Sequence, residues 1–381
     1  MATSANLSPV ERHFVALDSP TAGRNGAGYH PCQGVYFAPP SARPRTALIA
    51  THYNVDFSEH YLGEPMAARG YGFLGWNTRF RGAEAYFLLE HALVDIGVGV
   101  RWLREEAGVE RVVLLGNSGG GSLMAAYQSQ ATSPHIRPAH GLALPDAVND
   151  LPAADLYVSL NAHPGRPEVL TSWMDPSVTD ESDPLSVDPS LDMYDAANGP
   201  PYPPEFVARY RAAQEARNRR ITAWVLSELE RMKGRGAYDR VFNMHRTWAD
   251  LRLLDGSLDP SDRQLGVCYL GDPRWANYSP FVIGHTSTLR TWLSMWSLDH
   301  SECRGVPHLR RIEIPALVIQ SLADTGVFPS DARIIHENLA STDKRLELIP
   351  GEHYLREPAG AREAVADLIA GWLEEHGAAR A

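Results

Sequence analysis

The apolar positions of the chain fall into short runs that are separated by polar or glycine-rich stretches. These runs are rich in Val, Ile, Leu and aromatic residues, which is typical of buried β-strands. They lie at residues 12–18 (RHFVALD), 34–40 (GVYFAPP), 45–52 (RTALIATH), 71–78 (YGFLGWNT), 111–118 (RVVLLGNS), 154–162 (ADLYVSLNA), 315–322 (PALVIQSL) and 344–351 (KRLELIPG). A glycine-rich turn separates the first two runs, which predicts an antiparallel pair.

Helical spacing of apolar residues occurs between several of these runs. It predicts helices over residues 85–106, 122–131 and 361–376. Nearly continuous apolar strands that alternate with helices are typical of a parallel sheet covered on both faces. The pattern therefore predicts an α/β fold.

Residues 163–305 interrupt this alternation. The segment begins with an Asp-, Pro- and Ser-rich stretch, continues with a charged helix over residues 204–233, and ends in an aromatic-rich piece over residues 273–300. A structureless insertion of this length is unusual in a compact domain, so we expect a mainly helical cap over the sheet. The predicted core then comprises residues 1–162 and 306–381.

Composition narrows the class of protein. The formal net charge of −11 argues against a surface that binds nucleic-acid phosphates. Three distant cysteines (Cys32, Cys268 and Cys303) form no CxxC, which argues against a disulfide framework and favours a reducing, cytoplasmic location. Residues 1–14 lack the features of a signal peptide, and no apolar run approaches the about 18 residues of a membrane span.

One serine stands among glycines between a predicted strand and a predicted helix. Residues 116–120 (GNSGG) fit G-x-S-x-G, with Ser118 at the centre. Side chains at −2 and +2 would collide with neighbouring backbone in so tight a turn, and the serine would be held in a strained conformation with its hydroxyl exposed. A phosphate-binding turn and a purely structural turn are the alternatives, but the phosphate-binding glycine motifs are absent here.

A serine hydroxyl needs a base in contact, and the base needs an acid to orient it. Asp324 follows the strand at 315–322, and His353 follows the last strand. Both therefore belong at the edge of the sheet where open α/β sheets place their sites. Asp331 is better suited to capping the next helix. His376 belongs to the predicted terminal helix and is expected to be solvated, and Asp299 and His300 in the cap region are weaker rivals.

The oxyanion of an acyl transfer needs two N–H donors. We expect one from Gly119, at the start of the helix after Ser118. The second is expected from the loop after the strand at 45–52, with Asn54 as first choice and Tyr53 as second. His52 in the same loop is expected to brace it by hydrogen bonding.

With these residues the chain resembles the alpha/beta-hydrolase superfamily. The matching elements are VVLLGNSGGG, IQSLADTGVFP and IPGEHY, in the order Ser, Asp, His, together with IATHYN, where Tyr53 replaces a frequent glycine. The resemblance implies a mostly parallel eight-stranded sheet with helices on both faces, and a hydrolytic serine triad. Dehalogenases of the superfamily carry aspartate at the position of Ser118, so that reaction is disfavoured.

The expected function is hydrolysis of a small-molecule carboxylic ester or related acyl compound through an acyl-enzyme. Six of the nine tryptophans lie in residues 163–305 and favour an apolar or aromatic substrate. Arg79 and Arg81 follow a strand end and either meet an anionic group or tie down a loop. Hydrolysis of a carbon–carbon bond, acyl transfer, and a non-catalytic ligand-binding protein remain alternatives. No motif predicts a metal or other cofactor, and homo-oligomers stay open.

Overall fold

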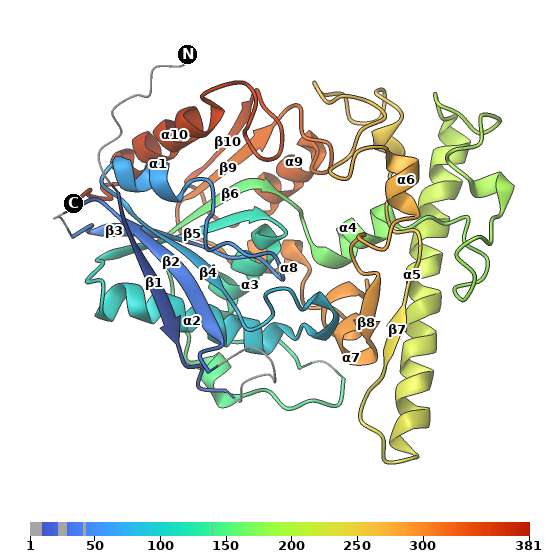
Figure 1. Cartoon of the computed structure of the whole chain (residues 1–381), viewed down its shortest axis with the longest axis horizontal. Coiled ribbons are helices and arrows are strands. Elements are labelled where there is room, and N and C mark those ends of the chain that lie inside the picture. Colours follow the sequence, from blue (N-terminus) through green and yellow to red (C-terminus); the bar gives the residue numbers. More distant parts are fainter. Residues whose placement is uncertain (1–9, 22–28, 41–42, 139) are drawn as a thin grey trace.

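Eight strands form one central sheet in the order β1-β2-β4-β3-β5-β6-β9-β10 (Figure 1). The structure is a computed structural model that describes residues 10–21, 29–40, 43–138 and 140–381. The strands are β1 (Glu11–Leu17), β2 (Cys32–Ala38), β3 (Thr46–Ala50), β4 (Gly72–Asn77), β5 (Arg111–Ser118), β6 (Leu156–Ala162), β9 (Ala316–Ser321) and β10 (Lys344–Ile349). The pairs β1–β2 and β2–β4 are antiparallel, and the remaining pairs are parallel.

The predicted strands and their mostly parallel arrangement are thus confirmed, including the antiparallel opening pair. Two features fall partly outside the described residues: the glycine-rich turn between β1 and β2, through residues 22–28, and the N-terminal stretch judged for a signal peptide, through residues 1–9.

Helices cover both faces of the sheet, as successive strand residues alternate between two apolar clusters. In β3, Ala47 and Ile49 belong to one cluster, while Leu48 and Ala50 belong to the other. Alternate side chains of a strand point to opposite faces, so this pattern requires cover on both sides. One face carries α1 (Gly63–Ala68) and α10 (Ala361–Glu375); the other carries α2 (Leu89–Glu105), α3 (Gly120–Thr132), α8 (Gly305–Leu309) and α9 (Pro329–Asn338) (Figure 1).

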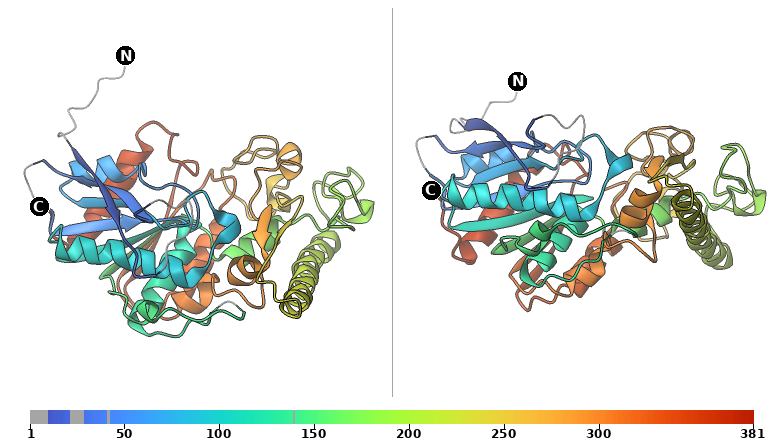
Figure 2. Two further views of the ribbon diagram at one scale, coloured as in Figure 1. Left: turned by 60° about the horizontal axis from the view of Figure 1, so that its bottom comes forward. Right: turned by 90° about the horizontal axis from the view of Figure 1, so that it is seen from below.

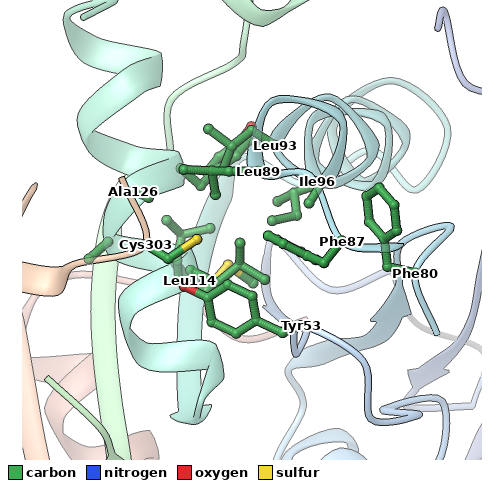
Figure 3. Close-up of a cluster of buried hydrophobic side chains, with 14 of the residues drawn as sticks. Tyr53, Phe80, Phe87, Leu89, Leu93, Ile96, Leu114, Ala126 and Cys303 are labelled. Atoms are coloured by element: carbon green, nitrogen blue, oxygen red, sulfur yellow. The ribbon is translucent and has the colours of Figure 1, made fainter. Parts of the chain in front are cut away.

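The helix predicted over residues 85–106 is interrupted. A short 3-10 helix, η1 (Glu84–Tyr86), precedes α2, because Phe87 and Leu88 have extended backbone. The break turns the Phe87 ring inward, where it lies 4.9 Å from the Tyr53 ring and 5.0 Å from the Phe80 ring (Figure 3). Packing of this aromatic group therefore overrides the helical pattern.

Residues 163–305 lie at one end of the molecule, away from both termini (Figures 1 and 2). Their most prominent element is the charged helix α5 (Pro204–Lys233), whose predicted bounds are confirmed. The other elements are α4 (Arg166–Trp173), α6 (Pro273–Asn277), α7 (Leu289–Thr291), the 3-10 helices η3 (Pro189–Leu191) and η4 (Leu251–Leu253), and the π-helix η5 (Trp292–Trp296). A two-stranded sheet, β7 (Val241–Asn243) and β8 (Thr286–Thr288), is not among the predicted elements. A 3-10 helix η2 (Asp146–Asn149) precedes β6.

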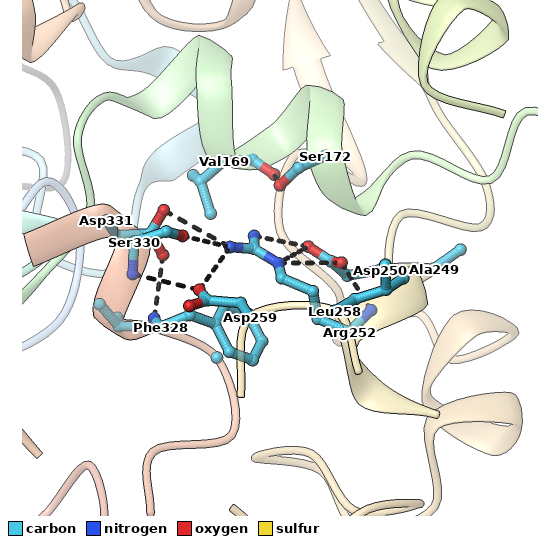
Figure 4. A network of polar contacts seen from close by, with 12 residues as sticks. Val169, Ser172, Ala249, Asp250, Arg252, Leu258, Asp259, Phe328, Ser330 and Asp331 are labelled. Atoms are coloured by element: carbon cyan, nitrogen blue, oxygen red, sulfur yellow. Dashed lines mark hydrogen bonds and ion pairs between the residues drawn. The ribbon is translucent and has the colours of Figure 1, made fainter. Parts of the chain in front are cut away.

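A buried charge network, centred on Arg252, joins this segment to α9 (Figure 4). Arg252 pairs with the fully buried Asp250 at 2.8 Å and lies 3.7 Å from Asp259 and 3.6 Å from Asp331. Its guanidinium also lies 3.9 Å from the centre of the Phe328 ring. The network holds residues 250–259 against the start of α9, which follows the loop of Asp324.

None of the described helices combines the length and the apolar character that crossing a membrane requires.

Candidate active site

Ser118 occupies a tight turn between β5 and α3. Its backbone has φ of +56°, in the left-handed region that non-glycine residues rarely adopt. A Cβ on Gly116 would lie 2.6 Å from the Cα of Gly121, and a Cβ on Gly120 would lie 2.2 Å from the carbonyl oxygen of Thr51. Both distances are shorter than non-bonded contacts allow, so the two glycines are what permits this turn. The predicted strained serine and its glycine requirement agree with this geometry.

Asp324 and His353 meet at the carboxyl ends of β9 and β10. Oδ2 of Asp324 lies 2.6 Å from Nδ1 of His353. The other carboxylate oxygen accepts hydrogen bonds from the backbone N–H groups of Gly326 at 2.9 Å and Val327 at 3.0 Å. The carboxylate is therefore fixed by its own loop and orients the imidazole. Asp331 instead accepts from the N–H of Phe328 at the start of α9, the capping contact expected of it.

Ser118 and His353 line the same pocket, which has a volume of about 620 Å³. Among the described residues, neither the Ser118 hydroxyl nor Nε2 of His353 has a hydrogen-bond partner, so the contact between them is not formed in this structure. Catalytic hydrogen bonds are often long without substrate and shorten in the reacting complex. The structure thus brings the three predicted residues to one site and forms the Asp324–His353 half of the arrangement.

The loop after β3 holds the residues predicted to give the second oxyanion donor. The backbone N–H groups of Asn54 and Val55 point to Nδ1 of His52, at 3.4 and 3.3 Å. The Tyr53 side chain is buried and its hydroxyl lies 3.0 Å from that of Ser122. His52 therefore braces the loop, as expected, and the Asn54 N–H is directed into the loop itself.

Tyr269 is a site residue that the sequence reasoning missed. Its hydroxyl donates to Oδ1 of Asp324 at 2.7 Å and lies 2.9 Å from Nδ1 of His353. Burial, followed by the charge of Asp324, raises the pKa of the Tyr269 phenol well above its ordinary value, so the phenol keeps its proton. A Cβ on Gly326 would lie 2.3 Å from the Tyr269 ring, so that glycine makes room for the tyrosine.

Arg166 and Glu84 were also missed. Arg166 is buried, lines the pocket, and donates to Glu84 at 2.7 Å across 82 residues of sequence. His163 is buried beside them, and its backbone N–H donates to the carbonyl of Ser118. Burial, followed by the nearby His353, lowers the pKa of His163 well below its ordinary value. The pocket lining around these residues is thus polar, and it includes the buried guanidinium of Arg166.

The tryptophans that favour an apolar or aromatic substrate line the pocket only in part. The six tryptophans of residues 163–305 occupy three environments: Trp173 and Trp248 line the pocket, Trp292 and Trp296 are fully buried elsewhere, and Trp224 and Trp275 are exposed. Phe281, Val282 and Ile283 add apolar surface to the pocket. The walls contributed by this segment are therefore largely apolar.

Neither of the two arginines singled out after β4 is among the described residues that line the pocket. Arg79 donates to both carboxylate oxygens of the buried Asp95. Arg81 pairs with Asp56 at 3.3 Å on the surface. Of the two expectations, the loop-anchoring contact is the one observed.

No family model and no curated protein matches the chain. Solved structures match it along nearly its whole length. The alpha/beta hydrolase GrgF from Penicillium sp. sh18 is 11% identical, with 96% of this chain and 99% of that chain covered and a TM-score of 0.52. The complex of DcsB with its substrate analogue gives the same identity, coverage and TM-score. An esterase domain of a Rhodothermus marinus protein is 12% identical over 96% of this chain and 98% of that chain, with a TM-score of 0.46. At such identities the likeness concerns the fold alone, and it confirms the predicted fold.

Proposed function

We propose that this chain, which has the alpha/beta-hydrolase fold, hydrolyses a small-molecule carboxylic ester with Ser118, His353 and Asp324 as its catalytic triad. The observation that carries the proposal is the 2.6 Å contact between Asp324 and His353 in a pocket that Ser118 also lines. A fold alone does not fix a reaction, so the proposal depends on these side chains.

In this mechanism His353 takes the hydroxyl proton of Ser118 through Nε2 as the serine oxygen attacks the ester carbonyl carbon. The carbonyl oxygen becomes an oxyanion, which the N–H of Gly119 stabilises. His353 then gives its proton to the leaving alcohol, and an acyl-enzyme remains. Water, deprotonated by His353, attacks the acyl carbon, and the carboxylic acid leaves as Ser118 recovers its proton.

The cap formed by residues 163–305 supports a substrate with an apolar or aromatic acyl group. Trp173 and Trp248 pack at 4.3 Å between ring centres, and Phe281 is 76% exposed although it lines the same pocket. Such surfaces gain affinity from buried hydrocarbon, at about 0.8 kcal/mol for each CH₂ group.

The test combines a covalent probe with an ester series. We expect a fluorophosphonate to label the wild-type protein on Ser118, read by mass spectrometry of the peptide. Among p-nitrophenyl esters, kcat/KM should rise about tenfold from acetate to butyrate, because two more CH₂ groups are buried. Equal rates across the series would contradict the apolar acyl site. A protein that is neither labelled nor active on any ester would favour the ligand-binding alternative.

Replacing Tyr269 by phenylalanine is expected to lower kcat/KM for ester hydrolysis about tenfold across the pH range. The hydroxyl neutralises part of the Asp324 charge through its hydrogen bond. The same hydroxyl contacts Nδ1 of His353, so without it the carboxylate and the imidazole are held less firmly in the orientation that catalysis needs. The measurement is the pH profile of ester hydrolysis.

Tyr354→Phe is the matched control for this prediction. The Tyr354 ring contacts both Tyr269 and His353, but no hydrogen bond of its hydroxyl occurs among the described residues. Its profile should match that of the wild type. Identical profiles for all three proteins would show that the Tyr269 hydroxyl does not orient the base.

A further inference from the structure

Arg166 is a buried cation whose guanidinium is held rigidly at the pocket floor. Nη2 donates to Glu84 at 2.7 Å, and the guanidinium carbon lies 4.9 Å from the Tyr53 ring centre and 4.6 Å from that of Trp296. The residue is 3% exposed, and it lines the pocket that contains Ser118. Among the described residues, its Nε and Nη1 have no hydrogen-bond acceptor. Rigid N–H groups without an acceptor, beside a pocket, are suited to bind an oxygen anion.

His52 presents a second donor in a fixed orientation. Its Nδ1 accepts from two backbone N–H groups, so the ring proton lies on Nε2. Burial, followed by the charge of Arg166, lowers the pKa of His52 well below its ordinary value, so the ring stays neutral. The Nε2–H has no acceptor among the described residues, and His52 lines the same pocket.

The two donors converge beside the residue that follows the nucleophile. A Cβ built on Gly119 would lie 2.7 Å from Nε2 of His52 and 3.0 Å from Nη1 of Arg166. Both nitrogens thus approach Gly119, whose own N–H is the first predicted oxyanion donor. The backbone N–H of Asn54, the first choice for the second donor, points to the His52 ring instead.

We propose that the side chains of His52 and Arg166, in place of a backbone N–H of residues 53–54, bind the negatively charged oxygen that forms when Ser118 attacks the acyl group. This inference rests on the proposed function. In a buried site a fixed guanidinium stabilises a developing negative charge far more than it would in water. Glu84 compensates the cation before the substrate is bound and holds it in place.

The experiment compares Arg166→Met and His52→Asn with the wild type. Asparagine places an oxygen near the position of Nδ1, so it can still accept from the loop N–H groups while the Nε2 donor is removed. For p-nitrophenyl benzoate we expect kcat to fall about 10²- to 10³-fold in Arg166→Met and by a smaller factor in His52→Asn, with KM changed less than about threefold. Arg304→Met, which removes a cation paired with Glu168 outside the pocket, is the charge-matched control and should retain the wild-type kcat.

Two inhibitors separate an oxyanion site from a carboxylate site. Phenyl trifluoromethyl ketone adds to Ser118 and places an oxyanion at the site, whereas benzoate is the planar product. We expect Arg166→Met to weaken the ketone about 10²-fold or more and benzoate hardly at all. Equal weakening of both, with a raised KM and unchanged kcat, would assign Arg166 to a substrate carboxylate and overturn the inference.

Loss of folding is addressed by a second variant. Arg166→Met leaves the partly buried Glu84 carboxylate without its guanidinium partner, with the N–H of Gly284 as its remaining contact. The double variant Glu84→Gln/Arg166→Met is therefore measured as well, with circular dichroism and thermal unfolding of each protein. The double variant should show the same loss of kcat. If the wild type is labelled by the fluorophosphonate and both variants keep its kcat, the inference fails while the proposed function stands. A wild type that is neither labelled nor active overturns both.

Discussion

Replacing Ser118 by alanine should lower kcat for ester hydrolysis by about 10⁴- to 10⁶-fold, the effect expected for a triad nucleophile. The hydroxyl oxygen forms the covalent bond to the acyl group, and alanine has no atom to replace it. A rate above that of water is still expected, because the pocket and the oxyanion donors remain. The measurement is initial-rate kinetics with p-nitrophenyl butyrate on extensively purified protein.

Ser122→Ala is the matched control for the nucleophile. Ser122 lies on α3, one turn after Ser118, and its hydroxyl contacts that of the buried Tyr53. We expect turnover within a few-fold of the wild type. If Ser118→Ala also retained near-normal turnover, hydrolysis would take place elsewhere and the triad would have to be abandoned.

Replacing Gly120 by alanine is expected to destabilise the fold by about 3 kcal/mol or more. Helix propensity predicts the opposite sign, since alanine gains up to about 1 kcal/mol over glycine within a helix. The added Cβ, however, would lie 2.2 Å from the carbonyl oxygen of Thr51, and both residues are buried main chain. The free-energy cost of moving α3 away from the end of β3 therefore exceeds the gain in helix propensity.

Gly371 provides the control for this substitution. It lies inside α10, and a Cβ built there meets no heavy atom within 4 Å. Gly371→Ala should therefore stabilise the protein by about 0.5–1 kcal/mol. Urea unfolding of both variants measures the difference in the free energy of unfolding. Equal stability of the two would mean that the α3–β3 contact is looser than the structure has it.

The regular part of the core could be predicted because its signals are local. Strand residues such as those of β5 are apolar on both faces, and glycines at 116 and 120 mark the turn between them and α3. Asp324 and His353 follow strand ends, and the topology of a parallel sheet brings such positions to one edge. The hydrogen bond between these two residues is consistent with that reasoning.

The missed residues depend on packing between distant segments. Tyr269 lies in an irregular stretch, so no strand or helix pattern places it near the site. The related feature of the sequence is Gly326, two residues after Asp324, which leaves room for the tyrosine ring. Arg166 and Glu84 are 82 residues apart in the sequence and form an ion pair. The spacing of charged residues along a chain does not predict a contact between such distant positions. The direction of the Asn54 N–H depends on how the His52 ring is turned, which a sequence does not specify.

The ion network at Arg252 limits how substrates can reach the serine. Swinging residues 250–259 away from α9 would separate Arg252 from Asp331 and from the Phe328 ring. It would also break the hydrogen bond from the N–H of Ser330 to Asp259, whereas Asp250 and Asp259 would move together with the arginine. These contacts therefore disfavour a hinged-open state on that side. Substrates should instead enter, and products leave, beside Phe281 and Tyr354, because both side chains are solvent-exposed and line the pocket. The width of an entrance that stays open would then determine which substrates enter. The association rate constant should depend on solvent viscosity only as much as substrate diffusion does.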